Sequence, residues 1–77
     1  MNEQIILAAD FNNNDANGRI RLNTKGTILD LERQSLILTQ GLSVLLKDYN
    51  DLVVMGTVEF SDRENIWVAK INWDDIS

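Results

Sequence analysis

The stretch LVVMGTVEF (residues 52–60) decides the fold class, because its second half alternates between apolar and polar side chains. Val58 and Phe60 would point to one side of a strand, and the polar residues between and before them to the other. This period of two is typical of a strand with one buried face. Gly56 interrupts the run, where a glycine usually marks a bulge, a sharp bend or a close backbone approach.

The flanking sequence continues the β pattern on both sides. IWVAKINW (residues 66–73) predicts a strand that places Lys70 and Asn72 on one face and the apolar residues on the other. LILTQGLSVLLKD (residues 36–48) contains two apolar runs separated by Gly41. The polar segments 48–51 and 61–65 suit hairpin turns, and the chain contains no proline that would break a strand.

Two more strands are predicted in the N-terminal part. IILAADF (residues 5–11) reads as the first strand, and GRIRLN (residues 18–23) as the second, with Ile20 and Leu22 facing the core. The dipeptide Asn17-Gly18 between them predicts a hairpin turn, because both residues tolerate positive φ.

One segment has helical rather than strand character. In TKGTILDLERQS, Thr27 and Asp30 have the spacing of a capping box, and Ile28 and Leu31 would share one helical face. We predict a short helix over residues 28–34. The alternative is a strand over residues 27–31 followed by a turn at ERQS.

The segment NNNDANGRI resembles the front half of a calcium-binding loop, counted from Asn13. The twelfth position, which should supply a bidentate carboxylate, is Thr24, and Asp15 is the one carboxylate among the early ligands. A strand pattern also follows where a helix is required. We therefore interpret the segment as a polar turn, with a weak, accidental calcium site as the alternative.

Composition limits the classes of function. The chain has 77 residues, enough for one small domain, and contains neither cysteine nor histidine, so disulfides, thiolate metal sites and histidine catalysis are excluded. Its formal charge of −5 repels phosphate backbones on average. The N-terminal apolar run is too short to span a bilayer and lacks a basic leader, so we expect a cytoplasmic protein without membrane contact.

A fold-level resemblance follows from the spacing of apolar residues and glycines over residues 36–73. The residues concerned are Leu38, Gly41, Val44 and Leu46, then Gly56 and Val58, then Trp67, Ala69 and Ile71. This spacing resembles that of the small Src-homology-3-like barrels of the Tudor and KOW type. The resemblance implies a fold and no ligand, because the aromatic cage of Tudor-type domains does not map onto this sequence.

Together these patterns predict a mainly β domain over residues 1–77. We expect a small antiparallel barrel of about five strands, with one short helix between the second and third strands. The expected core residues are Ile20, Leu22, Leu31, Leu38, Val44, Leu46, Val54, Val58, Trp67, Ala69 and Ile71.

The candidate interaction surface comprises two aromatic and three basic residues: Tyr49, Trp73, Arg19, Arg21 and Arg33. Tyr49 lies in a polar turn and should be exposed, whereas Phe11 is expected to seal a barrel end. On one strand, Trp67 and Trp73 would lie about 20 Å apart, too far to enclose one ligand together. The arginines could meet phosphate, or pair with acids of their own chain.

Three functions are compatible with this reading. The first is a non-catalytic protein-interaction module that uses barrel-end loops or an edge strand, and it is the one we favour. The second is a barrel that binds single-stranded RNA through Arg19, Arg21, Lys25 and Arg33. An enzyme ranks last, and no cofactor or metal is expected. The strand at residues 5–7 could also pair with a second copy, although completion of the barrel is the preferred role.

Overall fold

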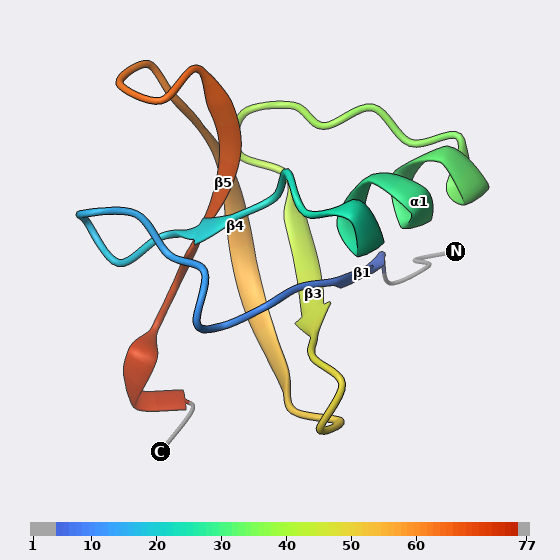
Figure 1. Cartoon of the computed structure of the whole chain (residues 1–77), viewed down its shortest axis with the longest axis horizontal. Coiled ribbons are helices and arrows are strands. Elements are labelled where there is room, and N and C mark those ends of the chain that lie inside the picture. Colours follow the sequence, from blue (N-terminus) through green and yellow to red (C-terminus); the bar gives the residue numbers. More distant parts are fainter. Residues whose placement is uncertain (1–4, 76–77) are drawn as a thin grey trace.

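The computed structural model describes residues 5–75 as one curled, five-stranded sheet with a short helix beside it (Figure 1). Its elements are β1 (Ile6–Ala8), β2 (Ile20–Arg21), α1 (Lys25–Gln34), β3 (Ser43–Lys47), β4 (Val53–Ser61), β5 (Ile66–Ile71) and the 3₁₀ turn η1 (Trp73–Asp75). The strand order is β1-β3-β4-β5-β2, and the sheet curves into a half-barrel. The mainly β class, the number of strands and the position of the helix are confirmed.

The prediction of a purely antiparallel sheet is wrong. β1 and β3 run parallel, with Ile6 opposite Leu45, whereas the other three strand pairs are antiparallel. A parallel pair needs a long crossover connection. Here β2, α1 and their loops supply that connection.

The antiparallel unit β3–β4–β5 forms the centre of the sheet. Gly56 lies where three strands approach closely, because a Cβ at this position would be 3.2 Å from Leu46 Cδ1 and 3.3 Å from both Ala69 Cβ and Ile71 Cγ2. This finding confirms the close backbone approach as the reason for the glycine. The central strand can therefore curve without steric conflict with its neighbours.

The N-terminal segment is less regular than predicted. β1 ends at Ala8 rather than at residue 11, because the chain turns where the Asp10 carboxylate accepts the backbone N–H of Asn12 at 2.9 Å. The turn at Gly18 is confirmed, with φ of 77°. However, β1 and β2 are not neighbours in the sheet. The turn at Gly18 instead folds the preceding loop back, so that Asn14 pairs with Ile20 at the start of β2.

The helix starts three residues before the predicted boundary. Thr24, not Thr27, is the N-cap, and its side chain accepts the Thr27 backbone N–H at 3.3 Å. The C-cap is Ser35, whose left-handed φ of 51° ends the helix. The alternative of a strand in this segment is wrong. Within residues 5–75 no helix has the length and apolar character to cross a bilayer.

Most of the expected core is confirmed. The fully or almost fully buried predicted residues are Ile20, Leu22, Leu38, Val44, Leu46, Val54, Val58 and Ala69. Leu31, Trp67 and Ile71 pack against this cluster but are only partly buried. The prediction omitted Leu7, Ala9, Phe11 and Val68, which are also buried. Burial of Phe11 confirms that it seals the core.

The two tryptophans do not share a strand. β5 ends at Ile71, and Trp73 begins η1. The Trp67 ring contacts Phe60 edge to face, with ring centroids 5.1 Å apart. Trp73 is 41% exposed, and its indole N–H donates to the Gly18 carbonyl at 2.8 Å. The predicted distance of about 20 Å between Trp67 and Trp73 assumed that both lie on one strand, and that assumption is wrong.

Candidate functional site

A groove of about 360 Å³ lies between the start of α1 and the outer face of the neighbouring strands β1 and β3. We call it the α1–β1 groove. Its apolar lining comes from Ile6, Ala8, Ala9 and Gly26. Tyr49, in the turn between β3 and β4, completes the lining and is 84% exposed. A large, mostly exposed aromatic side chain beside small apolar residues is typical of a binding surface.

The groove exists because α1 packs close to β1 without large side chains between them. At Gly26 a Cβ would be 3.5 Å from the Ala8 Cβ, which is ordinary van der Waals contact. Small residues on both elements therefore bring the two backbones together and leave the space above them empty.

Three hydrogen bonds hold α1 against the outer edge of β1. Asp30 Oδ2 accepts the Ala8 backbone N–H at 2.7 Å, and the Thr27 hydroxyl donates to the Ala8 carbonyl. Gln34 Nε2 donates to the Ile6 carbonyl at 3.1 Å. These side chains occupy the backbone groups that a further strand would need, so the edge of β1 is covered by the helix.

The polar lining of the groove is mainly acidic. Asp10, Asp30 and Asp48 line it, against one basic residue, Lys47. The Asp48 carboxylate is oriented by the backbone N–H groups of residues 50 and 52, which it accepts at 2.9 and 3.0 Å. Lys47 Nζ lies 3.4 Å from Asp51 and is thereby partly neutralised. The α1–β1 groove thus has an apolar floor and carboxylates at its polar positions.

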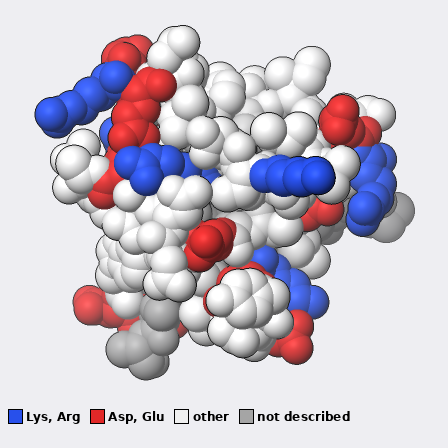
Figure 2. Space-filling model, viewed as in Figure 1, with Lys and Arg blue, Asp and Glu red and all other residues white. Residues whose placement is uncertain are grey.

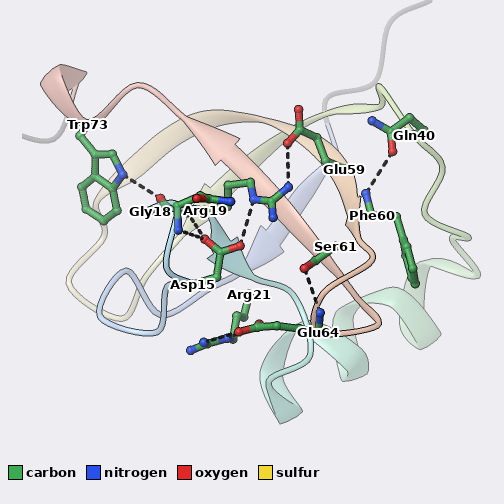
Figure 3. Close-up of polar contacts among 11 residues, drawn as sticks. Asp15, Gly18, Arg19, Arg21, Gln40, Glu59, Phe60, Ser61, Glu64 and Trp73 are labelled. Carbon is green, nitrogen blue, oxygen red and sulfur yellow. Dashed lines mark hydrogen bonds and ion pairs between the residues drawn. The ribbon is translucent and has the colours of Figure 1, made fainter.

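Two of the arginines predicted for the interaction surface, Arg19 and Arg21, lie away from this groove, and acids of this chain pair with them (Figure 3). Arg19 Nε lies 2.9 Å from Asp15 Oδ2, and its Nη1 lies 3.3 Å from Glu59 Oε1. Arg21 makes two bonds of 2.8 Å to Glu64. Arg33 is more exposed and lies 3.7 Å from Asp30. These three arginines therefore form ion pairs within the chain, which was the alternative to a contact with phosphate.

Asp15 is the most buried carboxylate among residues 5–75, with 5% of its side chain exposed. Burial alone would raise the pKa of Asp15. Hydrogen bonds from the backbone N–H groups of Arg19 and Asn17, together with the Arg19 guanidinium, outweigh this effect and lower the pKa below its ordinary value. Asp15 therefore stabilises the turn as a carboxylate. Residues 5–75 contain no group of three or more acidic side chains that could hold a metal ion.

The five predicted site residues do not form one patch. Arg19, Arg21 and Trp73 gather around the turn at Gly18, since Trp73 bonds this glycine (Figure 3). Tyr49 borders the α1–β1 groove, and Arg33 lies in the last turn of α1. The exposure predicted for Tyr49 is confirmed.

The sequence reasoning missed the groove itself. Ala8 and Gly26 leave room for the groove because they are small. Small size produces no periodic pattern in a sequence. The sequence predicts Asp10 within the first strand, Asp30 in a capping box and Asp48 in a turn, and no pattern indicates that the fold brings these three acids together. Gly26 lies outside the helix predicted for residues 28–34, and only the structure places it in the first turn of α1.

No family model, curated protein or solved structure matches this chain.

Proposed function

We propose that this protein is a non-catalytic interaction module that binds a segment of another protein in the α1–β1 groove. The observation that supports this function is the groove of about 360 Å³, with its apolar floor and the exposed ring of Tyr49 at its rim. An aromatic side chain with 84% of its surface in water has much to gain from burial against a partner. The chain also lacks histidine, the most frequent general acid–base residue, and cysteine, a common nucleophile.

The charge of the groove indicates the chemistry of the partner. Three carboxylates and one lysine line it, and the chain as a whole has a charge of −5. A segment with one or two basic side chains beside small apolar residues would complement both the sign and the shape. Acidic segments would be repelled.

The nucleic-acid alternative has weaker support. Three of its four basic groups, Arg19, Arg21 and Arg33, lie within ion-pair distance of acids of this chain. A phosphate contact by any of these three would have to replace an ion pair. Figure 2 shows acidic and basic side chains scattered over one face without a continuous basic patch. We therefore base the proposal on protein binding.

Selection from a displayed library of random peptides tests the function. Peptides enriched on the wild-type protein should contain lysine or arginine, and their affinity should fall about tenfold or more for Tyr49→Ala. Ile37→Ala is the matched control, because Ile37 is also an exposed apolar residue, at 82%, and does not line the groove. Its affinity should equal that of the wild type.

Two results would contradict the proposal. One is the absence of any enriched peptide after selection at low salt. The other is a set of enriched peptides that bind Tyr49→Ala as tightly as the wild-type protein. Binding of single-stranded RNA at low salt, with these peptides unbound, would instead support the alternative.

A further inference from the structure

Two turns of this chain share one pattern of backbone hydrogen bonds. In the first turn, residues 15–19, Asp15 Oδ1 accepts the N–H groups of Asn17 and Arg19 at 2.9 and 2.8 Å. The Asp15 carbonyl accepts the Gly18 N–H at 3.0 Å, and the Asp15 N–H donates to the Arg19 carbonyl at 2.8 Å. Three consecutive N–H groups are therefore held by one residue.

A second turn, which starts at Asp48, repeats this arrangement. Asp48 Oδ1 accepts the N–H groups of Asn50 and Leu52 at 2.9 and 3.0 Å. The Asp48 carbonyl accepts the Asp51 N–H at 3.2 Å. In each turn the third residue is an exposed asparagine, and the fourth has a positive φ, of 77° at Gly18 and 65° at Asp51. The residue that follows the asparagine is thus glycine in one turn and aspartate in the other.

This difference decides whether the asparagine side chain can react with the backbone. The nitrogen of the next residue loses its proton and attacks Cγ, so that a C–N bond forms. The Cγ–Nδ2 bond breaks, ammonia leaves with that proton, and a five-membered succinimide remains. Solvent water then opens the ring at either carbonyl and gives aspartate or isoaspartate. Glycine permits the approach because it has no Cβ, and Asn17 is the one asparagine that precedes a glycine in this chain.

We propose that Asn17 is a site of spontaneous deamidation, and that Asp15 sets its rate by holding the Gly18 nitrogen in the folded turn. The succinimide has no hydrogen on that nitrogen, so the bond to the Asp15 carbonyl must break before the ring closes. A local opening of the turn therefore precedes the reaction. Trp73 opposes this opening, because its indole N–H donates to the Gly18 carbonyl at 2.8 Å (Figure 3).

The isoaspartate product would alter the turn, whereas aspartate keeps the length of the main chain. In isoaspartate the main chain runs through Cγ, which adds one carbon atom between residue 17 and the next nitrogen. The N–H groups of Gly18 and Arg19 then no longer fit the two oxygens of Asp15 that accept them. The Gly18 carbonyl would also move relative to Trp73, so this conversion would release the indole from the turn.

Peptide mapping by mass spectrometry, after incubation of the full chain at mildly alkaline pH, tests the site. The peptide that contains Asn17 should gain the mass of an amide-to-acid conversion and give two products, aspartate and isoaspartate. Asn50, held in the same way but followed by Asp51, is the internal control and should stay intact. The folded chain should react at least about tenfold more slowly than the chain unfolded in urea, because the turn must first open.

The role of the glycine is tested by Asp51→Gly. This change places glycine at a positive φ that suits it, and creates a second asparagine–glycine pair in a turn of the same geometry. Asn50 should then deamidate in the folded chain. An intact Asn50 in this variant would contradict the proposal.

The restraint on the turn is tested by Asp15→Ala and Trp73→Phe. Asp15→Ala removes the acceptor of two N–H groups, and Trp73→Phe removes one donor at an exposed side chain. Trp73→Phe should speed the conversion of Asn17 roughly fivefold, the effect of one hydrogen bond, and Asp15→Ala should speed it more. Gly56→Ala, which strains the sheet elsewhere, is the control for general loss of stability and should leave the rate unchanged.

Indole signals in ¹⁵N NMR test the consequence for Trp73. The purified isoaspartate form should lose the slow hydrogen exchange of the Trp73 indole N–H, and Asn17→Asp, which has the sequence of the other product, should keep it. Unchanged indole exchange in the isoaspartate form would refute the release of Trp73.

Three further results would overturn the proposal. One is an intact Asn17 in the folded chain after a period in which it converts in urea. Another is equal rates for the folded and unfolded chains. The third is equal acceleration by Asp15→Ala and Gly56→Ala, which would mean that global unfolding, and not opening of the turn, precedes the reaction.

Discussion

At the scale of single residues, Gly56 is the position where the sheet tolerates least change. A methyl group there would lie 3.2–3.3 Å from atoms of Leu46, Ala69 and Ile71, on both neighbouring strands. Such contacts are tighter than normal packing, and the Ala69 Cβ cannot move without its backbone. The glycine is therefore required by space rather than by its own dihedral angles.

We expect Gly56→Ala to lower the free energy of unfolding by about 1–2 kcal/mol, because overpacking outweighs the entropy that alanine removes from the unfolded chain. Urea unfolding followed by circular dichroism measures the change. Thr57→Ala, at the exposed next position, should have an effect of less than about 0.5 kcal/mol. A Gly56→Ala variant as stable as the wild type would show that the three neighbours relax freely.

Asp15 gives the molecule part of its acid sensitivity. Its native pKa lies below the ordinary value of 3.8, and that of Glu64 lies below 4.5 because Arg21 bonds it. A lowered native pKa means that the stabilisation is complete above the ordinary value and is lost as the pH falls through the native one.

We therefore expect Asp15→Asn to be less stable than the wild type by about 1–3 kcal/mol at pH 7, with a smaller difference near pH 2. Unfolding curves at pH 7, 4 and 2 measure both quantities. Asp62→Asn, in the exposed turn after β4, is the control and should follow the wild type. If Asp15→Asn lost as much stability on acidification as the wild type, Asp15 would not be the relevant group.

At the scale of elements, α1 ends on an unfavourable residue. Ser35 adopts a φ of 51°, and its N–H donates to the Glu32 carbonyl at 3.1 Å. Glycine is the residue that adopts this left-handed conformation without steric cost. The Ser35 side chain is exposed, so little contact would be lost on its removal.

Ser35→Gly should accordingly raise the free energy of unfolding by about 0.5–1 kcal/mol, measurable as an increase in the thermal midpoint. Ser43→Gly is the matched control: an exposed serine in β3, outside the left-handed region, where glycine should destabilise the strand. A decrease for Ser35→Gly would contradict the C-cap geometry.

The sequence allowed some elements to be predicted and not others, for physical reasons. The alternation in residues 57–60 identified β4, because one face of that strand is buried whatever its neighbours are. The same alternation could not reveal that β1 pairs with β3, since periodicity specifies a face and not a partner. Tyr49 was correctly placed in an exposed turn, because the surrounding Asp and Asn residues form local bonds.

The α1–β1 groove was not predictable in this way. It depends on how closely Gly26 approaches Ala8, and these residues are far apart in the sequence. The pairing of Arg19 and Arg21 with acids of the chain was one of two readings, and tertiary structure was needed to identify Glu59 and Glu64 as their partners.

At the scale of the whole molecule, stability should be unevenly distributed. The central strands β3, β4 and β5 contain most of the fully buried side chains. α1 packs mainly against β1, and Thr27 is its one buried residue within the described chain. Among the described residues of α1, one apolar side chain, Leu31, packs on the core cluster, so a local opening of this helix should expose less of the core than an opening of the central strands.

Native-state hydrogen exchange should show this difference. Amides of α1 should exchange through openings of lower free energy than those of β4 at residues 56–60, and the gap should be at least about 2 kcal/mol. Low denaturant concentrations, at which partial openings are resolved, are the appropriate condition. Equal opening free energies for α1 and β4 would indicate that helix and sheet unfold as one unit.

The parallel pairing of β1 with β3 also has a consequence for biosynthesis. A ribosome makes Ile6 about 40 residues before Leu45, its neighbour in the sheet, and at 5–20 residues per second this is a delay of roughly 2–8 s. During that time Leu7, which is fully buried in the folded protein, lacks the β3 residues that it contacts in the sheet. The nascent N-terminal segment must therefore stay solvated until the centre of the sheet has been translated.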